Sequence, residues 1–137
     1  MKGGLSSLQP TSGGLTAIRH WRIIQKVELV ETSTFTRQIN ALLSDDEYRD
    51  FQSRIAANPE LGTLIRSGGG IRKVRVAVGT RGKSGGARVI YYWAVRRDII
   101  LLLFAYPKNA AEDLTPKQVS QLAKIVQEEF GHEKRNV

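Results

Sequence analysis

The chain has 137 residues, 41% hydrophobic and 25% charged, which is typical of a globular protein with one modest core. It contains no cysteine, and its two histidines lie near opposite ends, which excludes disulfides and thiolate chemistry and argues against a histidine-based metal site or catalytic triad. The net charge is +8, and residues 61–97 carry nine basic side chains and no carboxylate. Such a block favours a polyanionic partner over a solvated hairpin, whose surface usually mixes signs. We expect neither a metal nor another cofactor.

The first 25 residues are predicted to be a disordered N-terminal extension, because residues 1–14 are rich in glycine and serine and almost uncharged. Residues 15–25 could form a short helix or dock loosely. The start has no apolar stretch of about 7–15 residues and does not resemble a secretory signal. The longest apolar run, residues 99–105, is far short of the roughly 20 residues that cross a bilayer. We therefore expect a cytoplasmic protein without a membrane partner, with one domain over residues 26–137.

The first part of that domain predicts a short strand and a helical hairpin. Residues 27–30 suit a strand, and the apolar positions of residues 35–43 have helical spacing. Ser44 and Glu47 form a capping box in sequence, and Pro59 ends the helix that they begin.

Three strands are predicted next, over residues 71–78, 87–95 and 99–106, with a glycine-rich basic loop between the first two. Alternation puts Lys73 and Arg75 on the face opposite the valines of the first strand. In the second strand it puts Arg88 and Tyr92 on one face and the remaining aromatic residues on the other.

A last helix is predicted from Thr115, which serves as its cap with Gln118 three residues on, to Gly131. The fold class is therefore α+β, in the order β-α-α-β-β-β-α, with a mainly antiparallel sheet and helices packed on one face.

Two glycine-rich segments, residues 68–70 and 79–86, do not match a nucleotide-binding loop, because each adjoins strand-forming sequence. The second carries Arg81 and Lys83, which suit close approach to a nucleic-acid backbone. Tyr92 is a candidate for stacking on a base.

A set of spaced motifs closely resembles the HigB-like branch of the RelE/ParE toxin superfamily: DEY (46–48), NPELG (58–62), GGGIRKVRVA (68–77), GKSGGARVIYY (82–92), YPKN (106–109) and DLT (113–115). The resemblance covers residues 26–130 and implies the compact RelE-like fold. It implies the toxin of a type II toxin–antitoxin pair, an endoribonuclease that cuts mRNA on the ribosome without a metal. Its expected partners are a HigA-like helix-turn-helix antitoxin, the ribosome and mRNA, with operator DNA reached only through the antitoxin.

Carried over residue by residue, the resemblance implies four catalytic residues, Lys73, Arg75, Arg88 and Lys108. We also expect six residues to bind RNA or the ribosome: Arg72, Arg81, Lys83, Tyr92, Tyr106 and Asn109. Leu114 departs from the family, since it falls where RelE has a catalytic tyrosine, and we expect Tyr92, Tyr106 or a ribosomal group to compensate.

The chemistry of RNA cleavage is compatible with this set. The reaction needs a base for the 2′-hydroxyl, positive charge at the phosphate and a proton for the leaving oxygen. A lysine among other cations can have its pKa lowered and so act as the base. Two alternatives stay open: a ParE-like inhibitor of gyrase, which tends to lack such a basic face, and a non-catalytic RNA-binding protein.

Overall fold

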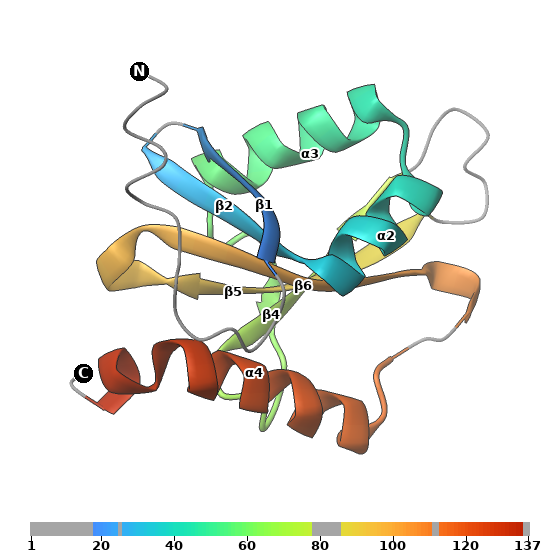
Figure 1. Ribbon diagram of the computed structural model, residues 1–137. Coiled ribbons are helices and arrows are strands. Elements are labelled where there is room, and N and C mark those ends of the chain that lie inside the picture. The colour runs from blue at the N-terminus through green and yellow to red at the C-terminus, as the bar shows by residue number, and fades with distance from the viewer. Residues whose placement is uncertain (1–17, 25, 78–85, 111–112, 136–137) are drawn as a thin grey trace.

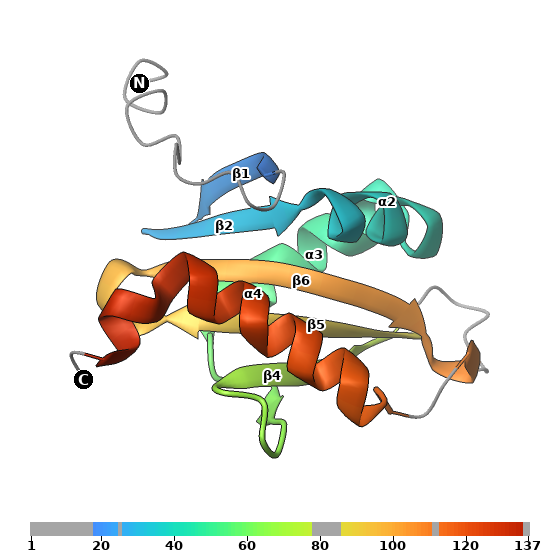
Figure 2. The ribbon, with the colours of Figure 1, turned by 60° about the horizontal axis from the view of Figure 1, so that its bottom comes forward.

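The computed structural model describes residues 18–24, 26–77, 86–110 and 113–135, which form a six-stranded sheet with helices on both faces (Figures 1 and 2). In chain order the elements are β1 (Ile18–Ile24), β2 (Val27–Thr32), α2 (Ser33–Leu42), α3 (Asp45–Ala57), β3 (Thr63–Leu64), β4 (Ile71–Val76), β5 (Ala87–Ala94), the 3-10 turn η2 (Val95–Arg97), β6 (Ile99–Pro107), the 3-10 turn η3 (Lys108–Ala110) and α4 (Pro116–Arg135).

The strands lie in the order β1-β2-β6-β5-β4-β3. β2 and β6 are parallel, and the other neighbours are antiparallel. The predicted α+β class is confirmed. The predicted element order is wrong because it lacks β1 and β3. The sheet is mixed because β2 and β6 run parallel, and the helical hairpin and the strands β3 to β5 connect them.

The prediction that the helices pack on one face is wrong, because the central strands are apolar on both faces. In β6, Ile100 and Leu102 belong to the hydrophobic cluster under α2 and α3, whereas Leu101 and Leu103 belong to the cluster under α4. Apolar side chains on both faces of a strand must both be covered. Figure 1 shows the sheet between α2 and α3 on one side and α4 on the other.

The helices of the first layer begin at side-chain caps. Thr32 accepts a hydrogen bond at Oγ1 from the backbone N–H of Phe35 (3.0 Å), which lies buried in α2. The predicted capping box is confirmed: Ser44 Oγ accepts from the Glu47 N–H (3.1 Å), and Glu47 Oε1 accepts from the Ser44 N–H (2.8 Å). These bonds satisfy amides that the first turn of a helix leaves unpaired.

The predicted cap of α4 is confirmed in the same way. Gln118 donates its backbone N–H to Thr115 Oγ1 (3.1 Å), and Thr115 donates its own to Gln118 Oε1 (2.8 Å). The buried side of α4 carries four apolar residues, Val119, Leu122, Val126 and Phe130. The predicted end at Gly131 is wrong, because the helix kinks at Phe130 (φ −126°, ψ 22°) and then continues to Arg135.

Where β2 ends, α2 and its N-cap residue form hydrogen bonds with the edge of β6. β2 pairs with β6 as far as Glu31 opposite Leu102. Beyond that point Thr32 Oγ1 donates to the carbonyl of Leu103 (3.1 Å), and Gln38 Oε1 of α2 accepts from the N–H of Ala105 (2.8 Å). These side chains satisfy backbone groups that a strand would otherwise pair.

Order was expected to begin at Lys26, and for residues 18–24 this expectation is wrong. They form β1, which pairs antiparallel with β2 so that Trp21 lies opposite Val30. β2 has a second edge with unpaired backbone groups, and β1 satisfies them. Residues 1–17 lie outside the described part of the chain.

Candidate nucleic-acid interface

Three neighbouring strands bring two arginines and a tyrosine into one row on the α4 face of the sheet. The register places Arg75 of β4 opposite Arg88 of β5, and Arg88 opposite Tyr106 of β6. Val74 points into the cluster under α2 and α3, so alternation turns Lys73 and Arg75 to the α4 face. We call Arg75, Arg88 and Tyr106 the cross-strand row.

A cavity of about 510 Å³ opens at this row, and its lining contains all four predicted catalytic residues: Lys73, Arg75, Arg88 and Lys108. Lys108 follows β6 directly, and its backbone N–H donates to the carbonyl of Gly86 (2.9 Å), which ties η3 to the start of β5. Asp113 also lines this row cavity and is the one carboxylate among the described residues that do. The cavity therefore offers a concentration of positive charge to an anion.

Two buried polar atoms of the row have no hydrogen-bond partner in the described part of the chain: Arg88 Nη1 and Tyr106 Oη. Buried donors are nearly always paired, and leaving one unpaired costs about 1–3 kcal/mol. Both atoms can donate to an oxygen of a bound anion. The row thus keeps two hydrogen-bond donors that the protein does not use.

Burial raises the pKa of the Tyr106 phenol above its usual value of 10.0. The charges of Lys73 and Arg88 act in the opposite direction, and that of Asp113 raises the pKa further. The Tyr106 hydroxyl therefore stays protonated over the physiological range, where it can donate a hydrogen bond.

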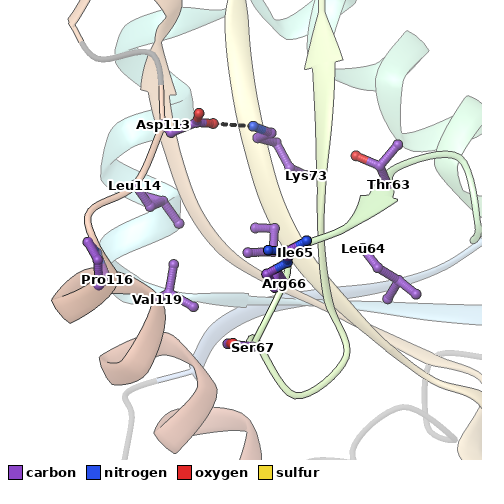
Figure 3. Close-up of a pocket in the computed structure, with 10 residues that line it drawn as sticks. All are labelled: Thr63, Leu64, Ile65, Arg66, Ser67, Lys73, Asp113, Leu114, Pro116 and Val119. Carbon is purple, nitrogen blue, oxygen red and sulfur yellow. Dashed lines mark hydrogen bonds and ion pairs between the residues drawn. The ribbon is translucent and has the colours of Figure 1, made fainter.

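Asp113 forms an ion pair with Lys73 and accepts a hydrogen bond from its ammonium (Figure 3). This hydrogen bond, then the Lys73 charge and the nearby Arg88, hold the pKa of Asp113 below its usual value. The sequence showed no counter-ion within residues 61–97, and the structure supplies one from 40 positions beyond Lys73. Asp113 stands in the DLT motif, but no local pattern indicated its partner.

Several predicted RNA-binding residues lie away from the row cavity. Arg72 shares a face with Val74 and donates through Nη1 to the carbonyl of Gly62 (2.7 Å). Tyr92 stacks on Phe130 of α4, with ring centroids 5.5 Å apart. Asn109 is exposed and does not line the cavity. Tyr106 belongs to the row, whereas Arg81 and Lys83 lie outside the described residues.

A second cavity, of about 470 Å³, lies beside the first, between the segment that begins with β3 and the start of α4 (Figure 3). Ten residues line it: Thr63, Leu64, Ile65, Arg66, Ser67, Lys73, Asp113, Leu114, Pro116 and Val119. We call it the flanking cleft. The sequence did not indicate it, because β3 has two residues and no strand pattern.

A family model described as the RelE toxin of the RelE/RelB toxin–antitoxin system matches residues 27–137. The chain belongs to the RelE toxin family. RelE family toxins pair with an antitoxin and are generally ribonucleases. The match begins at the first residue of β2, so β1 lies outside it. Among the described residues, no helix is long and apolar enough to cross a membrane.

Proposed function

We propose that this RelE family toxin is a ribosome-dependent endoribonuclease of the HigB-like branch, the toxin of a type II pair that cuts translated mRNA. The observation that carries the proposal is the row cavity, where Arg75 and Arg88 meet Lys73 and Lys108. In the cross-strand row, Arg88 Nη1 and Tyr106 Oη are buried without described partners, and phosphate oxygens would satisfy both.

In the proposed reaction, the ribose 2′-oxygen attacks the adjacent phosphorus and the bond to the 5′-oxygen breaks. The products are a 2′,3′-cyclic phosphate and a 5′-hydroxyl. Arg75 and Arg88 stabilise the negative charge that builds on the phosphate oxygens. The Tyr106 hydroxyl donates to the same oxygens and takes over part of the role of the tyrosine that Leu114 replaces.

Two proton transfers accompany the attack. Lys73 is engaged by Asp113, whereas no described carboxylate forms an ion pair with Lys108. We assign Lys108 to take the proton of the 2′-hydroxyl, and Lys73 to stabilise and protonate the leaving 5′-oxygen. These roles need no metal, and cleavage of free RNA at high protein concentration should survive EDTA.

The ribosome is proposed to supply the positioning of the RNA that the side chains do not provide. Lysines and arginines cleave RNA slowly unless the 2′-oxygen is held in line with the phosphorus, and positioning of this kind is worth several orders of magnitude in rate. A ribosome holds mRNA in a fixed path. A HigA-like helix-turn-helix antitoxin would neutralise the toxin and connect it to operator DNA.

The test is primer extension on a reporter mRNA translated by purified components. New 5′ ends should appear in the translated frame and vanish when initiation is blocked. Arg75→Ala and Arg88→Ala should each lower cleavage by about 100-fold or more. Arg49→Ala is the matched control, because this exposed arginine of α3 removes the same charge away from the row cavity.

Each part of the proposal has its own contrary result. Equal cleavage with and without ribosomes refutes the ribosome dependence. Full cleavage by a folded Arg88→Ala protein refutes the site. Intact mRNA together with a DNA-damage response in cells would instead support the gyrase alternative.

A further inference from the structure

The flanking cleft adjoins the row cavity, and Lys73 and Asp113 line both. When a nucleic-acid strand places a phosphate at the cross-strand row, the neighbouring nucleotide therefore lies at the mouth of the flanking cleft. The cleft, at about 470 Å³, has room for a nucleobase.

The walls of the flanking cleft are largely apolar. Leu114, just before α4, and Pro116 and Val119, at its start, form one side (Figure 3). Leu64 and Ile65 lie on the other, and Leu64 is 62% exposed, although large apolar residues are usually covered. Facing apolar surfaces suit a flat, weakly polar group.

The same cleft also has a polar rim at Thr63, Arg66 and Ser67. A guanidinium can stack on a base, and hydroxyls can pair with its edges. This rim differs from that of a purely hydrophobic groove, which would offer little to the nitrogen and oxygen atoms of a base.

The segment that carries the rim is fixed in shape. Ser67 has a positive φ of 64°, which is uncommon for a residue with a side chain and is often associated with functional sites. The Gly68 N–H donates to the carbonyl of Ile65, and the Ile65 N–H to that of Ile71 (both 3.0 Å). A Cβ at Gly68 would lie 2.6 Å from Ile71 Cγ1, so the segment packs without spare room. The cleft is therefore formed before a ligand arrives.

We propose that the flanking cleft binds one nucleobase of single-stranded RNA, that of a nucleotide next to the phosphate held at the cross-strand row. The proposal rests on the proposed function. It adds a contact to a base, in the flanking cleft, to the contact with a phosphate at the cross-strand row. A base of unpaired RNA is free to leave its stack and enter such a cleft.

The experiment measures the affinity of the full chain for a 2′-O-methyl RNA hexanucleotide, which cannot be cleaved, by fluorescence anisotropy. A series of matched hexanucleotides carries one abasic unit at each position in turn. All have the same number of phosphates. We expect one position at which losing the base weakens binding about five- to tenfold, somewhat below the effect of stacking on an aromatic residue.

Two exposed apolar residues provide the variant and its control. Leu64→Ala should reduce the effect of the abasic unit to less than about twofold, because it removes a wall of the cleft. Val95→Ala should leave it unchanged, because Val95 is similarly exposed, at 59%, and does not line the cleft. Arg88→Ala should weaken all the hexanucleotides alike and reduce the salt dependence.

The outcomes separate this inference from the proposed function. Equal binding of all hexanucleotides, with a salt dependence that Arg88→Ala reduces, overturns the base site and leaves the nuclease proposal standing. Failure to bind any of them at low salt overturns both. Loss of antitoxin binding in Leu64→Ala, with the abasic effect intact, assigns the cleft to a protein contact and overturns the base site.

Discussion

The two faces of the central strands differ in how far their buried polar groups are hydrogen-bonded within the protein. Under α2 and α3, the buried Glu31 accepts hydrogen bonds from the hydroxyls of Tyr48 (2.5 Å) and Thr36 (2.6 Å). The buried Tyr91 hydroxyl donates to the carbonyl of Pro59 (2.7 Å) and accepts from a backbone amide. These groups are paired within the protein, and this face is closed.

On the α4 face, Arg88 Nη1 and Tyr106 Oη are buried without a partner among the described residues. Trp93 Nε1 is an exception on the closed face, and nothing in the structure explains it. Unpaired buried donors lower the stability of the free protein and strengthen its binding to a ligand that pairs them. We therefore propose that the face under α2 and α3 serves stability and that the α4 face serves binding.

The largest test of this comparison changes one ionisable residue on each face to methionine. Arg88→Met should raise the free energy of unfolding by about 1–3 kcal/mol while abolishing RNA cleavage, because an unpaired buried donor is replaced by an apolar group. Urea denaturation and primer extension measure the two effects.

Glu31→Met provides the matched comparison on the closed face. It should lower the free energy of unfolding by about 1–3 kcal/mol, because it removes the carboxylate that accepts from the Tyr48 hydroxyl and one of the two acceptors of the Thr36 hydroxyl. A change of the same sign in both variants would remove the distinction between the faces.

Tyrosine-to-phenylalanine substitutions give a smaller contrast. Tyr106→Phe should lower the cleavage rate about tenfold, the effect of one donor aligned on the phosphate, and should raise the free energy of unfolding by about 1–3 kcal/mol, because it removes an unpaired buried donor. Because burial raises the pKa of Tyr106, wild-type cleavage should not lose this contribution below pH 10.0. A pH–rate profile and thermal melts check both statements.

Tyr91→Phe is the control for Tyr106→Phe. It removes two hydrogen bonds on the closed face, so it should lower stability by about 1–2 kcal/mol and leave cleavage within about twofold of wild type. Comparable loss of cleavage in both variants would indicate a general effect on the fold.

Local patterns were sufficient to predict much of this architecture. The capping boxes at Ser44 and Thr115 lie within three residues of their partners, and alternation correctly put Lys73 and Arg75 on one face. The same alternation puts Arg72 with Val74, so its placement away from the row cavity was already implied by the sequence.

Other features depend on contacts that are distant in sequence. Tyr92 was predicted to stack on a base, and its stacking on Phe130 of α4 is a contact that the local sequence could not indicate. The pairing of Asp113 with Lys73 likewise joins a strand to the loop before α4. The prediction of helices on one face was wrong because β5 and β6 carry apolar residues on both faces, and each face needs a helical cover.

The smallest expected effect concerns the carboxylate of the binding face. Asp113→Asn should strengthen binding of the uncleavable hexanucleotide about two- to fivefold at neutral pH, because it frees Lys73 and removes a negative charge from both cavities. Stability should change little, since Asp113 is exposed. Anisotropy titrations of the two proteins at one salt concentration measure the difference.

The pH dependence follows from the lowered pKa of Asp113. The ion pair is fully present above the usual pKa of 3.8 and is lost as the pH falls through the lower folded value, so the two proteins should differ throughout the neutral range. Asp46→Asn is the control, because it removes the same charge from α3, where Asp46 pairs with Arg49. If Asp46→Asn strengthened binding equally, net charge would explain the effect. If it did not, Asp113 competes with the RNA phosphate for Lys73.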